Sequence, residues 1–107
     1  MSLEDRLDEL ERRLAEIEAE WSRPEVASDP GLSRKLGREQ AQIGPIVENY
    51  RSLKAAVAAI DSARHELQTE SDPELKELAR ELIAENEAEA TRLREELRVQ
   101  LLPADLN

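Results

Sequence analysis

Residues 3–21 read LEDRLDELERRLAEIEAEW, and their large apolar residues recur at alternating spacings of four and three. This spacing places the apolar side chains along one face of a helix. The positions concerned are Leu3, Leu7, Leu10, Leu14, Ile17 and Trp21. Ser2 precedes this stretch and Asp5 lies three residues later, a pair that fits a capped helix start. We therefore predict a first helix over about residues 3–21.

Two longer helices are predicted downstream, each beginning at an Asp-Pro pair. Asp29-Pro30 fits a capping residue followed by a proline in the first turn, where the missing N–H costs nothing. Asp72-Pro73 fits the same pattern, but Ser71 with Glu74 also fits a capping box, so both Ser71 and Asp72 are candidate caps. The third helix should end before Pro103, because the residue before a proline avoids the helical region. We predict helices over about 30–69 and 73–102.

Apolar seams run along both long helices. The second seam contains Leu32, Leu36, Ile43, Val47, Tyr50, Leu53, Val57, Ile60 and Leu67. The third contains Leu75, Leu78, Leu82, Leu93, Leu97 and Leu101, and between Leu82 and Leu93 its weaker positions are held by Ile83, Asn86 and Ala90. Gly44-Pro45 lies inside the second helix, and a proline there removes one backbone hydrogen bond and crowds the preceding turn. We expect a kink or a short break near residues 44–45.

These segments predict an all-α fold. At 1.5 Å per residue the second and third helices would be about 55 and 45 Å long, against about 30 Å across a compact domain of this size. Because the link between them is short, they should form an antiparallel hairpin. We therefore expect one domain over residues 1–107, an elongated three-helix antiparallel coiled-coil-like bundle in which the shorter first helix packs on a long helical hairpin.

The composition argues against an enzyme. The 107 residues contain no cysteine and no adjacent glycines, which excludes disulfides, thiolate metal sites and a glycine-rich phosphate loop. His65 is the only histidine, and a single histidine near a helix end is usually solvated. We expect no catalytic residue, no cofactor and no metal. With no secretory signal and no long apolar run, the sequence predicts a cytoplasmic protein and no membrane partner.

The net charge of −10 is unevenly distributed. The second helix has a modest basic surface, formed by Arg34, Lys35, Arg38, Arg51 and Lys54. Acidic residues recur every four positions in the third helix, at Glu77, Glu81, Glu85 and Glu89. Most such charges are solvated or answer charges on neighbouring helices, and the overall negative charge repels phosphate. We regard both groups as candidate partner surfaces and expect no strong nucleic-acid binding by this chain alone.

Four short segments in a fixed order are similar to a known family. They are PEV at 24–26, IVENY at 46–50, DPEL at 72–75 and LLPAD at 101–105. Together they resemble the amino-terminal domain of bacterial class I peptide chain release factors over essentially the whole chain. The closing segment looks more like the type that reads UAA and UAG. Leu106 departs from the family pattern, which usually has proline there.

The resemblance implies a non-catalytic role in translation termination. In these factors a Gly-Gly-Gln tripeptide supports peptidyl-tRNA hydrolysis and a Pro-x-Thr type tripeptide reads the stop codon, and neither occurs here. The chain would therefore be the amino-terminal part of a longer factor. The implied partners are the ribosome, at the stalk base of the large subunit, and the class II release factor GTPase.

Two other functions fit the residues without the resemblance. A generic coiled-coil oligomerisation module would use the apolar seams between chains, although Gly44-Pro45 and the weak centre of the third helix argue against a long zipper. An RNA-binding helical arm would use the basic residues of the second helix. Such an arm should bind RNA with a steep salt dependence, which an acidic chain is not expected to show.

Overall fold

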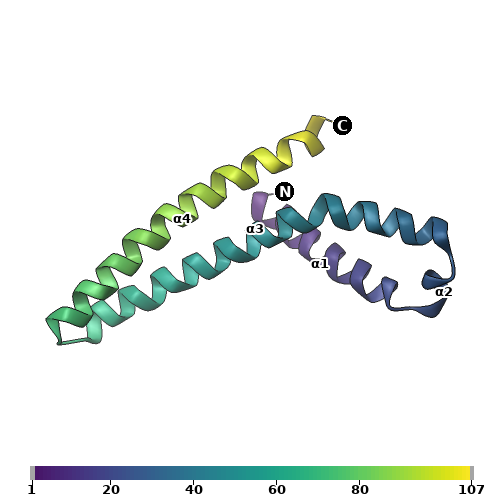
Figure 1. Ribbon diagram of the computed structural model, residues 1–107. Helices are drawn as coiled ribbons and strands as arrows, with labels where there is room; N and C mark the ends of the chain where they lie inside the picture. The colour runs from purple at the N-terminus through teal and green to yellow at the C-terminus, as the bar shows by residue number, and fades with distance from the viewer. Residues whose placement is uncertain (1, 107) are drawn as a thin grey trace. The chain divides into compact units, whose positions relative to one another are not determined.

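The computed structural model describes residues 2–106 and, in that range, consists of α-helices with no strand (Figure 1). The helices are α1 (Leu3–Trp21), α2 (Pro24–Ala27), α3 (Pro30–Thr69) and α4 (Pro73–Leu106). The all-α prediction is confirmed, with the short α2 as an addition that the sequence did not predict. Contacts group the chain into two compact units, Met1–Glu48 and Asn49–Asn107, so the 40-residue α3 contributes to both. The prediction of one domain over residues 1–107 stays a prediction.

Side chains cap the helices where the sequence indicated. The Asp5 backbone N–H donates to Ser2 Oγ at 3.1 Å, and the Ser2 N–H donates to Asp5 Oδ2 at 3.3 Å, which completes a capping box. The Leu32 N–H donates to Asp29 Oδ1 at 3.1 Å at the start of α3. These contacts satisfy backbone donors that have no partner inside the helix.

The start of α4 decides between the two candidate caps. The Glu74 backbone N–H donates to Asp72 Oδ1 at 2.9 Å, so Asp72 is the cap. The N–H groups of Ser71 and Asp72 both donate to Glu70 Oε1 at 3.0 Å, which holds the turn between α3 and α4. Ser71 therefore belongs to the turn and not to the helix cap.

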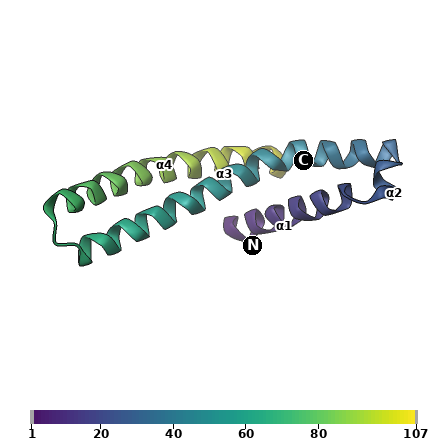
Figure 2. The same ribbon diagram turned by 60° about the horizontal axis from the view of Figure 1, so that its bottom comes forward.

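Unit Met1–Glu48 has a core of large apolar side chains. α1 and the first part of α3 lie side by side, joined through α2 (Figures 1 and 2). Their buried residues are Leu14, Ile17, Val26, Leu36, Ile43 and Val47, with Leu10 and Trp21 packed against them. Val26 brings α2 into this core, and the Ser33 hydroxyl donates to the Val26 carbonyl at 2.9 Å. Each fully buried side chain of this size contributes about 1.5–3 kcal/mol.

Unit Asn49–Asn107 is a helical hairpin with a different core. Asn49 Nδ2 donates to Gln100 Oε1 at 3.0 Å and Arg64 Nη2 to Glu87 Oε1 at 3.2 Å, so residues later in α3 meet residues earlier in α4. The hairpin is therefore antiparallel, as predicted. Leu93, Leu97 and Leu101 are buried along α4 near its C-terminal end. Toward the turn, the buried residues are Ile60 and the small Ala56, Ala63 and Ala79, with Ala90 at the centre of α4.

The predicted seam of the third helix is wrong in its first half. Leu75, Leu78 and Leu82 are exposed, by 40%, 50% and 39%. The face that packs against α3 keeps the predicted Ile83, Asn86, Ala90, Leu93, Leu97 and Leu101, but toward the turn it continues through Ala79 and not through the three leucines. This register keeps spacings of three and four without a gap, and the small alanines let the two backbones approach closely. Packing of the whole face therefore outweighs the size of the individual leucines.

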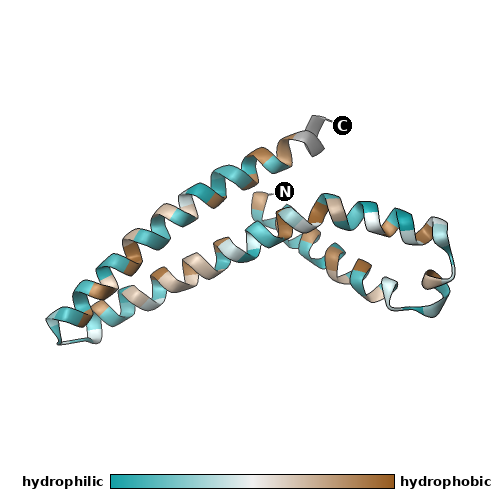
Figure 3. Ribbon diagram, viewed as in Figure 1, coloured by the Kyte–Doolittle hydropathy of each residue, from teal (hydrophilic) through white to brown (hydrophobic). Residues whose placement is uncertain are grey.

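Leu32, predicted as a core residue of the second helix, is also exposed, because it lies in the first turn of α3. Tyr50 is buried, and Trp21 is partly buried against the core of the first unit. The interpretation of both aromatic rings as packing residues is confirmed. Figure 3 shows the resulting alternation of apolar and hydrophilic positions along the helices.

No break interrupts α3 at Gly44-Pro45, because the helix continues from Pro30 to Thr69 with Pro45 inside it. Ile43, Val47 and Tyr50 are buried on either side of the proline, and their packing favours the helical path despite the lost hydrogen bond. Gly44 has an ordinary negative φ, so no special backbone conformation is used there. The predicted kink stays a prediction.

The third long helix does not stop before Pro103, because α4 extends to Leu106. A proline lacks its own N–H donor and crowds the preceding turn, but only one backbone hydrogen bond is lost and the following residues keep theirs. The preference of Leu102 for extended backbone is thus overridden in the last turns of an otherwise stable helix. Within the described residues, none of the helices is both long enough and apolar enough to cross a bilayer.

Candidate interaction surfaces

The predicted basic surface is divided between the two units. Arg34, Lys35 and Arg38 are exposed on α3 in the first unit, whereas Arg51 and Lys54 are exposed on α3 in the second. The Lys54 ammonium lies 4.4 Å from the centre of the Tyr50 ring, a cation–π contact. The structure therefore does not show the five bases as one surface, and their role in binding a partner stays a prediction.

The acidic row of α4 is partly neutralised within its own helix. Glu77 Oε2 lies 3.2 Å from Arg80 Nη1, and Glu89 Oε1 lies 2.6 Å from Arg92 Nη2. The hydrogen bond from Arg92 lowers the pKa of Glu89 below its ordinary value. Glu81 and Glu85 are exposed and have no ion pair among the described residues. The four residues do share one helix, but they divide into two paired and two unpaired carboxylates.

A charged pair that the sequence did not predict links α1 to α3. Arg13 donates from Nε to Glu39 Oε2, and from Nη2 to Glu39 Oε1 at 2.8 Å, a two-pronged contact. This hydrogen bonding lowers the pKa of Glu39 and raises that of Arg13. Residue types alone did not reveal this pair, because α1 and α3 both carry many other charges. It holds the two helices in register.

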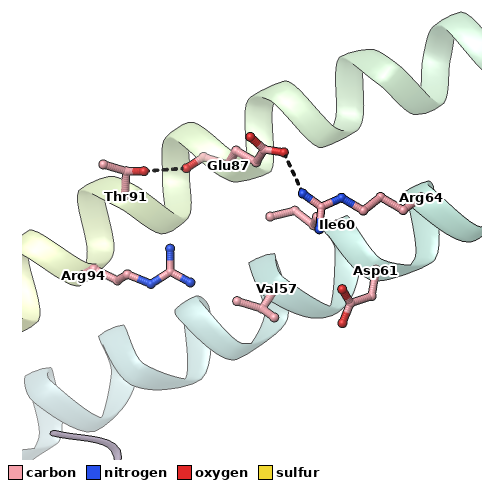
Figure 4. A pocket seen from close by; sticks show the side chains of 7 residues that line it. All are labelled: Val57, Ile60, Asp61, Arg64, Glu87, Thr91 and Arg94. Atoms are coloured by element: carbon pink, nitrogen blue, oxygen red, sulfur yellow. Dashed lines mark hydrogen bonds and ion pairs between the residues drawn. The ribbon is translucent and has the colours of Figure 1, made fainter.

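Between α3 and α4 the second unit has an open groove of about 310 Å³ (Figure 4). It is lined by Val57, Ile60, Asp61, Arg64, Glu87, Thr91 and Arg94. Arg64 crosses the groove to Glu87, and the Thr91 hydroxyl donates to the Glu87 carbonyl at 3.0 Å. The charged groups lie at the rim and remain exposed to water. This groove lacks the desolvated, converging groups that an active site uses.

A second shallow hollow, of about 380 Å³, lies in the first unit between α1 and α3. Leu14, Gly44 and Pro45 form part of its wall, and Glu18 and Glu48 contribute its carboxylates. His65, the single histidine, is exposed in the second unit, where its carbonyl accepts a hydrogen bond from Thr69. Among the side chains that the structure describes, residues 2–102, no group of three or more potential ligands could hold a metal ion.

The surface that sequence reasoning missed is the row of exposed leucines on α4. Leu75, Leu78 and Leu82 were expected inside the hairpin, but they face solvent. The sequence contains the signal for this register, because Ile83 and Asn86, which were predicted on the seam, lie three or four residues apart in line with Ala79 and not with Leu82. A prediction that gives large side chains more weight than regular spacing therefore misplaces the three leucines.

Comparisons with known proteins identify a family and several relatives that are similar to this chain. The PCRF domain family matches residues 10–107 of the chain. The chain is 37% identical over 103 residues to Peptide chain release factor 1 of Lachnoclostridium phytofermentans and 40% identical over 103 residues to that of Listeria welshimeri. Identity to Peptide chain release factor 1 of Clostridioides difficile is 36% over 102 residues.

These alignments cover nearly all of this chain but a minor part of each relative. They span 95–96% of the chain and 29% of the full length of each relative. The search of solved structures found no match. The relatives therefore carry more than two thirds of their sequence outside the region that is similar to this chain.

Proposed function

The chain belongs to the PCRF domain family, and from this premise we propose that it is a non-catalytic interaction domain of a translation termination factor. The observation that carries the proposal is the similarity of 95–96% of the chain to proteins named Peptide chain release factor 1, of which it spans 29%. A region of that size leaves most of a whole factor for stop-codon reading and peptidyl-tRNA hydrolysis. The open, water-exposed grooves of both units agree with a binding role.

We propose that the whole factor recognises UAA and UAG and acts in the cytoplasm on the ribosome. Within it, this domain would contact the stalk base of the large subunit and cooperate with the class II release factor GTPase. Exposed charge of both signs on a helical scaffold supports this role, since such surfaces steer and orient partners.

The finer arrangement of the helices is part of the same proposal. We infer that the first helix packs on the hairpin of α3 and α4 as one three-helix bundle, because α3 belongs to both compact units. Distances between spin labels on exposed positions of α1 and α4 test it. A narrow distance distribution supports one bundle, and a broad one contradicts it.

Deleting this domain from the full-length factor tests the function. Release of peptide from stop-codon complexes would be measured in single turnover, over a range of factor concentrations, with and without the GTPase. We expect the intact and deleted factors to reach the same hydrolysis rate at saturation. The deleted factor should require a higher concentration and lose its response to the GTPase. A large loss of the saturating hydrolysis rate would contradict a non-catalytic role.

A matched control keeps the test specific. The variant Glu9→Gln, an exposed position on α1 without an ion pair among residues 2–106, should behave as the intact factor does. A deleted factor that keeps both its affinity and its response to the GTPase would show that this domain serves neither partner.

A further inference from the structure

The row of exposed leucines on α4 is an apolar surface without a partner in its own unit. Leu75, Leu78 and Leu82, here termed the leucine strip, are spaced by three and four residues and therefore share one face of the helix. They are between 39% and 50% exposed, whereas Leu93 and Leu97 on the same helix are fully buried. Three large apolar side chains together on a surface helix are a common mark of a binding site.

The charges beside the leucine strip differ from those elsewhere on α4. Glu74 and Glu81 lie four residues before and three after Leu78, and Glu85 lies three after Leu82, so all three border the strip. None of these carboxylates has an ion pair among residues 2–106. The remaining acids of α4 whose side chains are described are all paired, namely Glu77, Glu87, Glu89, Glu95 and Glu96.

This distribution of charges indicates which charge the partner should carry. The two bases of this stretch, Lys76 and Arg80, lie one or two positions from the leucines and so do not share their face, and Arg80 pairs with Glu77. The apolar face therefore lies next to three carboxylates that have no ion pair in the described part of the chain. Nucleic acid and anionic lipid are repelled by this field. A second copy of the chain would place its own carboxylates against these carboxylates, and the two sets would repel each other. A cationic partner gains from both features.

We propose that the leucine strip with Glu74, Glu81 and Glu85 docks a basic amphipathic helix of a protein partner. The apolar face of that helix packs on Leu75, Leu78 and Leu82, and its lysines and arginines lie against the carboxylates. The inference concerns this surface itself and goes beyond the proposed function, since it does not require the ribosome or the GTPase. The contact is small, as is typical of transient recognition.

Two synthetic peptides provide the test. One is an 18-residue peptide of leucine and lysine with leucines at helical spacings of three and four. The other has the same composition in an order that gives no apolar face. Fluorescence anisotropy with the complete 107-residue chain should show the first peptide binding about tenfold more tightly, because only it presents both features at once. Equal binding of the two peptides would overturn the proposal.

Variants then locate the site. Leu75→Gln, Leu78→Gln and Leu82→Gln together should remove the preference for the patterned peptide, and circular dichroism checks that the helices remain. Val99→Gln, also at an exposed apolar position of α4, is the matched control and should leave binding unchanged. Binding that survives the triple leucine substitution, or that falls equally in the control, would place the site elsewhere.

Charge is tested separately, so that the proposal does not depend on the leucine variants. Glu74→Gln, Glu81→Gln and Glu85→Gln together should weaken binding of the patterned peptide to the chain by about tenfold at low salt. The control Glu4→Gln, Glu9→Gln and Glu18→Gln changes net charge equally and should have a much smaller effect. If both triple variants weakened binding equally, the peptide would be attracted only by the net charge of the chain, and the proposal would be overturned.

Analytical ultracentrifugation tests whether a second copy of the chain occupies the leucine strip. We expect the chain to be monomeric at the concentrations used. A dimer that the triple leucine variant dissociates, and that the triple glutamine variant at the acids strengthens, would identify a second copy as the occupant instead.

Discussion

The two units share α3 and have similar net charge, but they differ in how they are packed. In Met1–Glu48 the core is made of large side chains such as Ile17 and Val47, and a two-pronged Arg13–Glu39 contact links the helices. In Asn49–Asn107 the half of the hairpin near the turn is packed through small alanines together with Ile60, and Leu75, Leu78 and Leu82 are exposed. The core of the first unit thus consists of large leucine, isoleucine and valine side chains, although Leu3 and Leu32 are exposed. The second unit instead exposes three leucines on one face of α4.

The largest expected effect is a cavity in the first unit. Ile17→Ala should lower the free energy of unfolding by about 2–5 kcal/mol, because Ile17 is completely buried. Leu78→Ala, on the exposed strip of the second unit, should change it by no more than about 0.5 kcal/mol. Urea denaturation followed by circular dichroism measures both. Equal losses would mean that the leucine strip is structural and would remove the contrast between the units.

The alanine seam of the second unit should resist enlargement. Ala79 is almost completely buried where α4 meets α3, so Ala79→Leu should destabilise the hairpin by about 1–3 kcal/mol through overpacking. Ala84→Leu at an exposed position of the same helix is the matched control and should be nearly neutral. Hydrogen exchange of amides in residues 49–102 reports the effect on this unit. A stabilising Ala79→Leu would show that the seam is loose.

Capping at the hairpin turn gives a third and smaller effect. Asp72→Ala should cost about 1 kcal/mol, because the Glu74 N–H loses its acceptor. Ser71→Ala should cost much less, since the Ser71 backbone and not its side chain makes the turn contact. The order of the two urea midpoints is the readout, and the reverse order would make Ser71 the cap.

The helix that both units share can be tested at Gly44. A Cβ at this position meets nothing within 4 Å, and the backbone is helical, so Gly44→Ala should stabilise the chain by about 0.5–1 kcal/mol. A break at residues 44–45 would make alanine neutral or unfavourable. Thermal unfolding of Gly44→Ala beside the unsubstituted chain distinguishes the two, and a lower Tm contradicts a continuous α3.

The smallest expected effect is the pH dependence of the Arg13–Glu39 pair. Because the hydrogen bond from Arg13 lowers the pKa of Glu39, the pair contributes stability above the ordinary glutamate pKa of about 4.3. That contribution is lost as the pH falls through the lowered pKa of the folded state. Glu39→Gln should therefore cost a little stability at pH 7 and nothing at strongly acid pH, by urea denaturation.

Glu87→Gln provides the comparison from the second unit. The Arg64–Glu87 pair is a single 3.2 Å contact between exposed side chains, and such pairs contribute little. We expect a smaller loss at pH 7 than for Glu39→Gln. A larger loss would mean that charge, and not alanine packing, holds the hairpin near its turn.

Much of the secondary structure was predictable because its signals are local. Ser2, Asp29 and Asp72 each place a side-chain acceptor beside backbone N–H groups a few residues away, and proline follows two of them. The start of every long helix therefore follows from nearby residues alone. The ends are less certain, as Pro103 shows, because a helix with many other bonds tolerates the loss of one.

The candidate surfaces were less predictable, because a charge or a leucine has many suitable neighbours until the helices pack. Residue spacing identified Glu77, Glu81, Glu85 and Glu89 as one row but not which of them would be paired. It also grouped five bases that the structure divides between two units. Such outcomes depend on which faces meet, which is a property of the whole packed seam.

The sequence by itself determined an all-helical chain, its helix starts, its net charge of −10 and its resemblance to a release-factor domain. Only the tertiary structure decided that Ala79 and not Leu78 faces α3. It also decided that Arg13, which contacts Glu16 and Glu20 of its own helix, pairs with Glu39 of α3. The physical reason is the range of the interactions. Caps and turns form between neighbouring residues, whereas burial and ion pairing between helices depend on how closely two distant backbones can approach.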